Sequence, residues 1–121
     1  MKVVRAALLA LLALPGCLGG TENSDGSPPQ VAIQSPLPGA EVSGQVIIDV
    51  LAIDDFAVNK VRILVDGALL GAELYVQPYR AIWNTATLAD QSSHIIRVEA
   101  FDLAGNIGTT SITVTVVKGR T

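Results

Sequence analysis

The sequence predicts an all-β protein, a β-sandwich of about seven antiparallel strands preceded by a signal peptide and a flexible linker. Two observations support this expectation. Apolar residues recur at every second position in short runs between residues 31 and 117, which is the period of a strand with one buried face. Pro, Gly and Asp separate these runs, and none of them has the period of a helix. An apolar sheet face must be covered, so two packed sheets are expected.

Residues 1–16 have the order of a signal peptide. Lys2 and Arg5 precede an uninterrupted apolar run at 6–14, and Pro15 ends it. A membrane-spanning helix needs about 20 apolar residues, whereas a signal peptide combines a basic start, a shorter apolar run and small residues at the cleavage site. The run therefore predicts export.

The stretch Leu14-Pro15-Gly16-Cys17 contains the only cysteine of the chain. It resembles the lipobox of bacterial lipoproteins, although that family more often has Ala or Ser in place of Pro15. The resemblance implies cleavage before Cys17 and acyl chains on Cys17, which would bind the protein to a membrane. The alternative is an ordinary secretory signal that leaves a free thiol.

Residues 17–30 are expected to form a flexible tether after the lipidated cysteine. Gly, Ser, Asn, Asp and Pro dominate this segment, which has too little apolar surface to order itself. The folded domain is expected at 31–117, with 118–121 as a tail. Without residues 1–16 the chain has six basic and eleven acidic residues, a net charge of −5. This acidic balance predicts no nucleic-acid partner.

Each expected strand follows from its pattern. Alternation places Val46, Ile48, Val50 and Ala52 on one face of the second run, and Asp66-Gly67 is a hairpin signal because that turn needs positive φ. The later runs alternate in the same way. The expected strands are 31–35, 45–53, 60–66, 68–73, 79–84, 94–102 and 107–117.

Several motifs of the domain fall in a recognisable order. They are Val-Asp-Gly at 65–67, Pro78-Tyr79 followed by Trp83, and the turn from Ala100 to Asn106. Together they resemble the bacterial immunoglobulin-like domains of cell-surface proteins and secreted glycosidases and peptidases, over about residues 29–117. The resemblance implies a rigid module for spacing or binding, with no disulfide and no activity to carry over.

The sequence offers no convincing catalytic or zinc site. His94 is the only histidine, and Ser92 and Ser93 lie beside it on a strand whose neighbouring side chains point to opposite faces. No nucleophile elbow is recognisable. One histidine and an acylated cysteine cannot supply the three or four ligands that zinc needs. The chain is therefore expected not to be an enzyme.

Four oxygen-bearing side chains are candidates for a structural calcium site. Asp54 and Asp55 follow the second expected strand, and Asp102 and Asn106 belong to the turn after the sixth. In an immunoglobulin-like sandwich these two loops lie at one end, and calcium takes 6 to 8 oxygen ligands. The favoured alternative is that each side chain accepts hydrogen bonds from its own turn. No other cofactor is expected.

Apolar residues at positions expected to face outward suggest an interaction face, because a contiguous apolar patch is typical of a partner surface. The alternative is that loops cover part of this patch. The candidates are Ile47, Leu51 and Ile53 on one strand, Leu64 on another, and Ile95 and Phe101 on a third.

These expectations combine into a non-enzymatic lipoprotein of the bacterial cell envelope. Acyl chains on Cys17 hold it on a membrane, and its domain serves in adhesion, binding or spacing, with a protein, a glycan or another copy as partner. Leu18 in place of the aspartate of retained lipoproteins points to the outer membrane where the host has one, and otherwise to the outer face of the cell membrane. The alternatives are an accessory subunit of an envelope or secretion complex, bound through its edge strands, and an accessory module related to secreted hydrolases.

Overall fold

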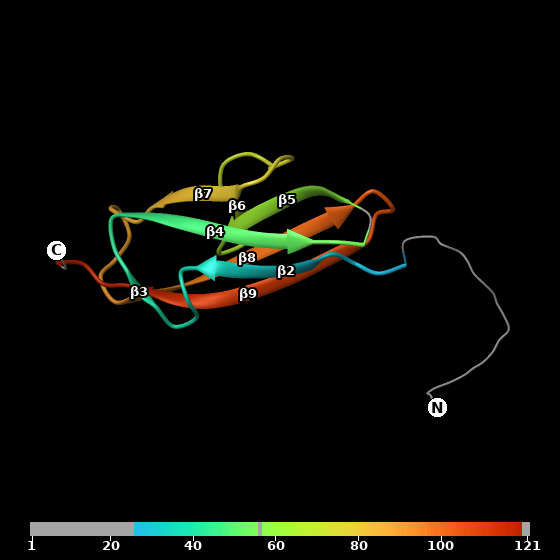
Figure 1. Cartoon of the computed structure of the whole chain (residues 1–121). Helices are drawn as coiled ribbons and strands as arrows, with labels where there is room; N and C mark the ends of the chain where they lie inside the picture. The colour runs from blue at the N-terminus through green and yellow to red at the C-terminus, as the bar shows by residue number, and fades with distance from the viewer. Residues whose placement is uncertain (1–25, 56, 120–121) are drawn as a thin grey trace, which may run out of the picture.

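A computed structural model describes residues 26–55 and 57–119, which form two β-sheets packed face to face (Figure 1). One sheet has three strands in the order β2-β4-β7, and the other has five in the order β3-β9-β8-β5-β6. The strands are β2 (Gln30–Ser35), β3 (Glu41–Val42), β4 (Gln45–Ile53), β5 (Val58–Val65), β6 (Ala68–Leu69), β7 (Tyr79–Asn84), β8 (Ser92–Asp102) and β9 (Ile107–Val116).

The sandwich confirms the predicted fold class, and eight strands are described where about seven were expected. The expected ranges 45–53 and 79–84 agree with β4 and β7. Every pair is antiparallel except β3 with β9, which is parallel. Within residues 26–55 and 57–119, no helix is long and apolar enough to span a membrane.

The expected strand at 68–73 is wrong beyond its first two residues. The strand β6 ends at Leu69 because the chain turns at Gly71, whose φ is +73°, a conformation that favours glycine. The chain then returns to β5, where the main chains of Leu74 and Val61 exchange two hydrogen bonds of 2.8 and 2.9 Å. An irregular segment thus covers the outer edge of β5.

The core lies between the sheets and follows the predicted alternation. Along β4 the side chains alternate between exposed or half-buried and buried, as the period of two requires. Both sheets contribute fully buried residues, and Trp83 of β7 completes the layer. The core cluster is Val46, Ile48, Val50, Ala52, Val61, Ile63, Tyr79, Trp83, Ile96, Val98, Ala100, Val114 and Val116.

The predicted Asp66-Gly67 turn joins β5 to β6, and both residues have positive φ, +52° and +86°. The Asp66 carboxylate also ties the turn to β8. Its Oδ1 accepts a 2.9 Å hydrogen bond from the Ile95 N–H, and its Oδ2 lies 2.6 Å from His94 Nδ1. Burial, the largest influence, raises the pKa of Asp66, but the hydrogen bonds from His94 and Ile95 outweigh it and leave the pKa below its usual range.

Gly108 allows the start of the domain to lie against β9. It is buried in β9, and a Cβ at this position would overlap the main-chain oxygen of Pro29. Pro29 is itself buried. The close approach of these two main chains therefore fixes where the N-terminal segment joins the sandwich.

We expect Gly108→Ala to lower the free energy of unfolding by about 1–3 kcal/mol, because the added methyl group overpacks a site bounded by rigid main chain. Chemical denaturation followed by Trp83 fluorescence measures the loss. Gly26→Ala is the control, since its Cβ would meet nothing within 4 Å. Equal stabilities of the two variants would contradict the close approach.

We expect Asp66→Asn to lower stability by about 0.5–1 kcal/mol near neutral pH, because Asn tolerates the turn but lacks the charge. The folded pKa of Asp66 lies below its unfolded value, so the carboxylate stabilises the fold above about pH 4 and this contribution disappears as the pH falls further. Urea unfolding between about pH 7 and pH 3 should therefore show a shallower acid loss for the variant than for the wild type. Asp55→Asn, on an exposed loop, is the control, and identical acid slopes for wild type and Asp66→Asn would rule the effect out.

Candidate functional site

The predicted lipidation site, Cys17, lies outside the described residues, as do the signal peptide and most of the tether. The described chain begins at Gly26 and reaches the sandwich through Ser27 and Pro28. It enters at the end where β4 and β8 finish (Figure 1). An anchor at Cys17 would therefore attach to this end, which we call the N-terminal end.

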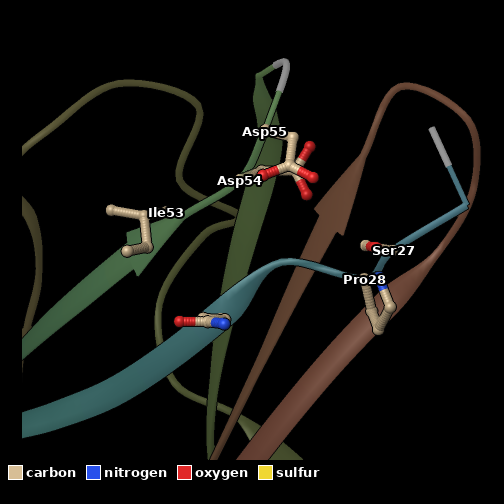
Figure 2. A pocket seen from close by; sticks show the side chains of 6 residues that line it. Ser27, Pro28, Ile53, Asp54 and Asp55 are labelled. Atoms are coloured by element: carbon tan, nitrogen blue, oxygen red, sulfur yellow. The ribbon is translucent and has the colours of Figure 1, made fainter. Parts of the chain in front are cut away.

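A pocket of about 210 Å³ lies at the N-terminal end. Figure 2 shows Asp54 and Asp55 on one side of this pocket and Ser27 and Pro28 on the other. The strands β4 and β8 run to the same end, so the β4–β5 and β8–β9 loops both lie there, as the immunoglobulin-like arrangement predicts.

The four calcium candidates do not form one ligand set. Asp102 is buried, and its carboxylate accepts hydrogen bonds from the main-chain N–H of Asn106 at 2.8 Å and from Asn106 Nδ2 at 2.9 Å. These bonds close the β8–β9 turn, as expected if the Asp102 side chain accepts hydrogen bonds from its own turn. In the described parts of the chain, no group of three or more His, Cys, Asp or Glu side chains could hold a metal ion. Asp54 and Asp55 line a pocket without Asp102 or Asn106.

The predicted interaction face is divided between the two sheets. Ile47, Leu51 and Ile53 are exposed on the outer face of the three-stranded sheet. Ile95 is exposed on β8 of the other sheet, where Phe101 is half-buried with Lys60 Nζ 4.9 Å from its ring centroid. The expectation that all these residues form a single patch is therefore wrong.

Leu64 is buried, with 9% of its surface exposed, and the expectation that it belongs to an open face is wrong. It lies opposite Leu69 in the β5–β6 pair. The segment after β6 then returns to the same edge of β5, where Leu74 pairs with Val61. The alternation along β5 predicts that Leu64 points away from the core, but it does not predict that Leu64 is buried there.

The sequence reasoning missed Ile82, which is 62% exposed and lies beside Ile47 in the β4–β7 pair. The signal was present, because alternation along 79–84 places Tyr79, Ala81 and Trp83 on one face and Ile82 on the other. Ile82 therefore extends the apolar surface of the three-stranded sheet.

The outer face of the five-stranded sheet carries an ion network centred on Glu73. Its carboxylate lies 3.2 Å from Lys60 Nζ and 3.4 Å from Arg62 Nε, and it accepts a 2.9 Å hydrogen bond from the Tyr75 hydroxyl. The Tyr75 hydroxyl and Lys60 lower the pKa of Glu73, whereas Glu73 raises the pKa of Tyr75. Ion pairs continue from Arg62 to Glu99 and from Glu99 to Arg97.

His94 joins Asp66 to Ser92, a contact that the sequence reasoning did not foresee. Ser92 is two residues from His94 and therefore shares its face of β8, with Ser92 Oγ 2.7 Å from His94 Nε2. The Ser92 hydroxyl donates to the Ala89 carbonyl at 2.6 Å, and the His94 ring lies edge-on to Trp83 with centroids 5.6 Å apart. The contacts of His94 and Ser92 therefore link β8 to the Asp66-Gly67 turn and to the chain segment at Ala89.

Several solved structures contain domains similar to this chain. The fibronectin(III)-like modules of Clostridium thermocellum CbhA are 26% identical, with a TM-score of 0.63 over 74% of this chain and 47% of theirs. The endo-β-1,4-mannanase of Thermotoga petrophila is 18% identical, with a TM-score of 0.59 over 77% of this chain and 20% of its own. The chain thus spans about half of the first protein and a fifth of the second. Comparison with curated proteins finds no match.

The spore cortex lytic enzyme SleM of Clostridium perfringens is similar over 69% of this chain and 30% of its own, with 19% identity and a TM-score of 0.50. At this identity the likeness concerns the fold. The family model described as bacterial Ig domain matches residues 29–116, a range that holds every described strand. The chain therefore belongs to the bacterial Ig domain family.

Proposed function

We propose that the chain is a lipid-anchored, non-catalytic module of the bacterial envelope, which holds its immunoglobulin-like domain on a membrane to bind a partner or to act as a spacer. Acyl chains on Cys17 supply the membrane contact. Two or three such chains hold a protein stably, whereas one alone binds reversibly. The domain itself then needs no membrane-binding surface.

The observation that carries the proposal is the path of the chain through the sandwich. The N-terminal segment joins the domain at one end, and β9 leaves it at the opposite end (Figure 1). Eight residues, 18–25, separate Cys17 from Gly26, the first described residue, and a fully extended chain over that interval reaches about 30 Å. An anchor at Cys17 would hold the N-terminal end near the membrane and direct the far end outward.

The side chains that resemble catalytic groups support a structural role instead. The single histidine of the chain is held between the Asp66 carboxylate and the Ser92 hydroxyl. The Ser92 hydroxyl also contacts the Ala89 carbonyl at 2.6 Å, so these side chains tie β8 to the β5–β6 turn and to the segment at Ala89. A module of this family fold, used for binding or spacing, fits these contacts.

A second candidate is an accessory subunit of an envelope or secretion complex. The three-stranded sheet ends in β2 and β7, each paired on one side with β4. An edge strand of this kind can pair with a strand of another protein. Stoichiometric co-purification with envelope machinery would favour this candidate over an adhesion module.

We expect Cys17→Ala to abolish incorporation of labelled palmitate and to move the protein from the membrane fraction to the soluble fraction, because the acyl chains have no other attachment site. Fractionation and protease treatment of whole cells measure both location and exposure. Pro15→Ala is the matched control, since it brings the lipobox closer to the family pattern and should keep the protein anchored. A Cys17→Ala chain that stays in the membrane fraction, or a wild type without acyl label, would refute the anchor.

A further inference from the structure

The outer face of the three-stranded sheet is apolar and exposed to solvent. Ile47 and Ile82 are 57% and 62% exposed and lie side by side, while Leu51 and Ile53 are also exposed farther along β4. Residues with alternate positions on one strand point to the same side, so these side chains share one surface. Exposed apolar side chains gathered on one surface are typical of a protein interface.

The charges on this face form one neutral pair. Asp49 on β4 and Arg80 on β7 are neighbours in the strand register, and their charged groups lie 3.3 Å apart. The other outward positions of β4 and β7 carry uncharged side chains, Gln45, Ile47, Leu51, Ile53, Ile82 and Asn84. The face is therefore electrically neutral on a chain of net negative charge, which removes the repulsion that two acidic molecules would otherwise meet.

The register of β4 and β7 makes the face complementary to itself. Ile47 is paired with Ile82, and Asp49 with Arg80. Consider a two-fold axis that lies in front of this face, runs parallel to the strands and passes over the line midway between β4 and β7. It would place β4 of one molecule opposite β7 of the other. Ile47 would then face Ile82 of the second copy, and Asp49 would face Arg80 of the second copy. Apolar groups thus meet apolar groups, and each charge meets its opposite.

We propose that a second copy of this chain docks on the outer face of the three-stranded sheet and forms a symmetric dimer. A two-fold contact of this type uses the same surface of both molecules, and sheets packed face to face with nearly aligned strands form a common arrangement. The four charges form a ring of two intramolecular and two intermolecular pairs. The ion network of the opposite face stays outside this contact.

The axis also places both N-terminal ends on the same side of the dimer, because it runs along the strands. Two anchors at Cys17 could then enter one membrane. This step rests on the proposed function, whereas the complementarity of the face does not. Confinement to a membrane raises the effective concentration of the two copies and favours a contact that is weak in solution.

Charge reversal with complementation tests the dimer. Asp49→Lys leaves two positive charges on the face, and Arg80→Glu leaves two negative charges. We expect each variant alone to dimerise about tenfold or more weakly than the wild type, since like charges then meet across the axis. A 1:1 mixture should form a heterodimer at least as tight as the wild-type dimer. Sedimentation equilibrium of the full chain, purified in detergent, measures these constants.

Two further variants separate the dimer from a loss of folding. Ile82→Arg should weaken association without changing the melting temperature by more than a few degrees, because its side chain is exposed. Ile95→Ser, on the outer face of the other sheet, should leave association unchanged. If the mixed charge variants fail to associate, or if Ile95→Ser abolishes association, the proposed face is wrong. A wild type that stays monomeric overturns the proposal. This holds even if the same face binds a different envelope protein and Ile82→Arg prevents that binding.

The same measurements on Cys17→Ala keep the two proposals apart. A Cys17→Ala chain that is soluble and still forms the charge-complemented heterodimer supports both. A chain that is soluble but never associates, with a wild type that is monomeric in detergent, overturns the dimer and leaves the anchor. Association of a chain that never carries acyl label overturns the anchor and leaves the dimer.

Discussion

Burial of apolar side chains between the two sheets is the constraint on which the domain depends. The single cysteine of the chain is Cys17, so the sandwich lacks the inter-sheet disulfide that antibody domains use. Trp83 and Tyr79 come from the three-stranded sheet, and Ile96 and Val98 come from the five-stranded sheet, all within the core. Large-to-small substitutions at such buried positions typically cost several kcal/mol, which shows how much of the stability this layer must supply.

The periodic strands could be predicted because their pattern reports a buried face directly. The ranges of β4 and β7, the two-sheet architecture and the Asp66-Gly67 turn all follow from alternation and turn chemistry. The two-residue β3 could not be predicted, because its parallel pairing with β9 depends on where the chain lies after the preceding turn. The return of the segment after Gly71 to Val61 likewise has no periodic pattern that would predict it.

The acidic N-terminal end shows why residue type alone does not identify a site. Asp102 and Asn106 have the chemistry of calcium ligands, yet their side chains bind each other and close one turn. A carboxylate that is buried in such a turn is already compensated by hydrogen bonds. His94 and Ser92 lie 2.7 Å apart, and each also binds another part of the chain, His94 the Asp66 carboxylate and Ser92 the Ala89 carbonyl. The role of these groups depends on their hydrogen-bond partners within the fold, which sequence patterns do not reveal.

The two outer faces differ in a way that stability alone does not require. The ion pairs around Glu73, whose side chains are half-buried, place charges on one face, and the cost of desolvating these charges opposes its association. On the other face, exposed isoleucines flank the Asp49–Arg80 pair. A face that served only as a spacer would gain solubility from charges in place of Ile47 and Ile82. The apolar surface, with its neutral and self-complementary charge pair, therefore supports the proposal that this side of the domain makes the contact.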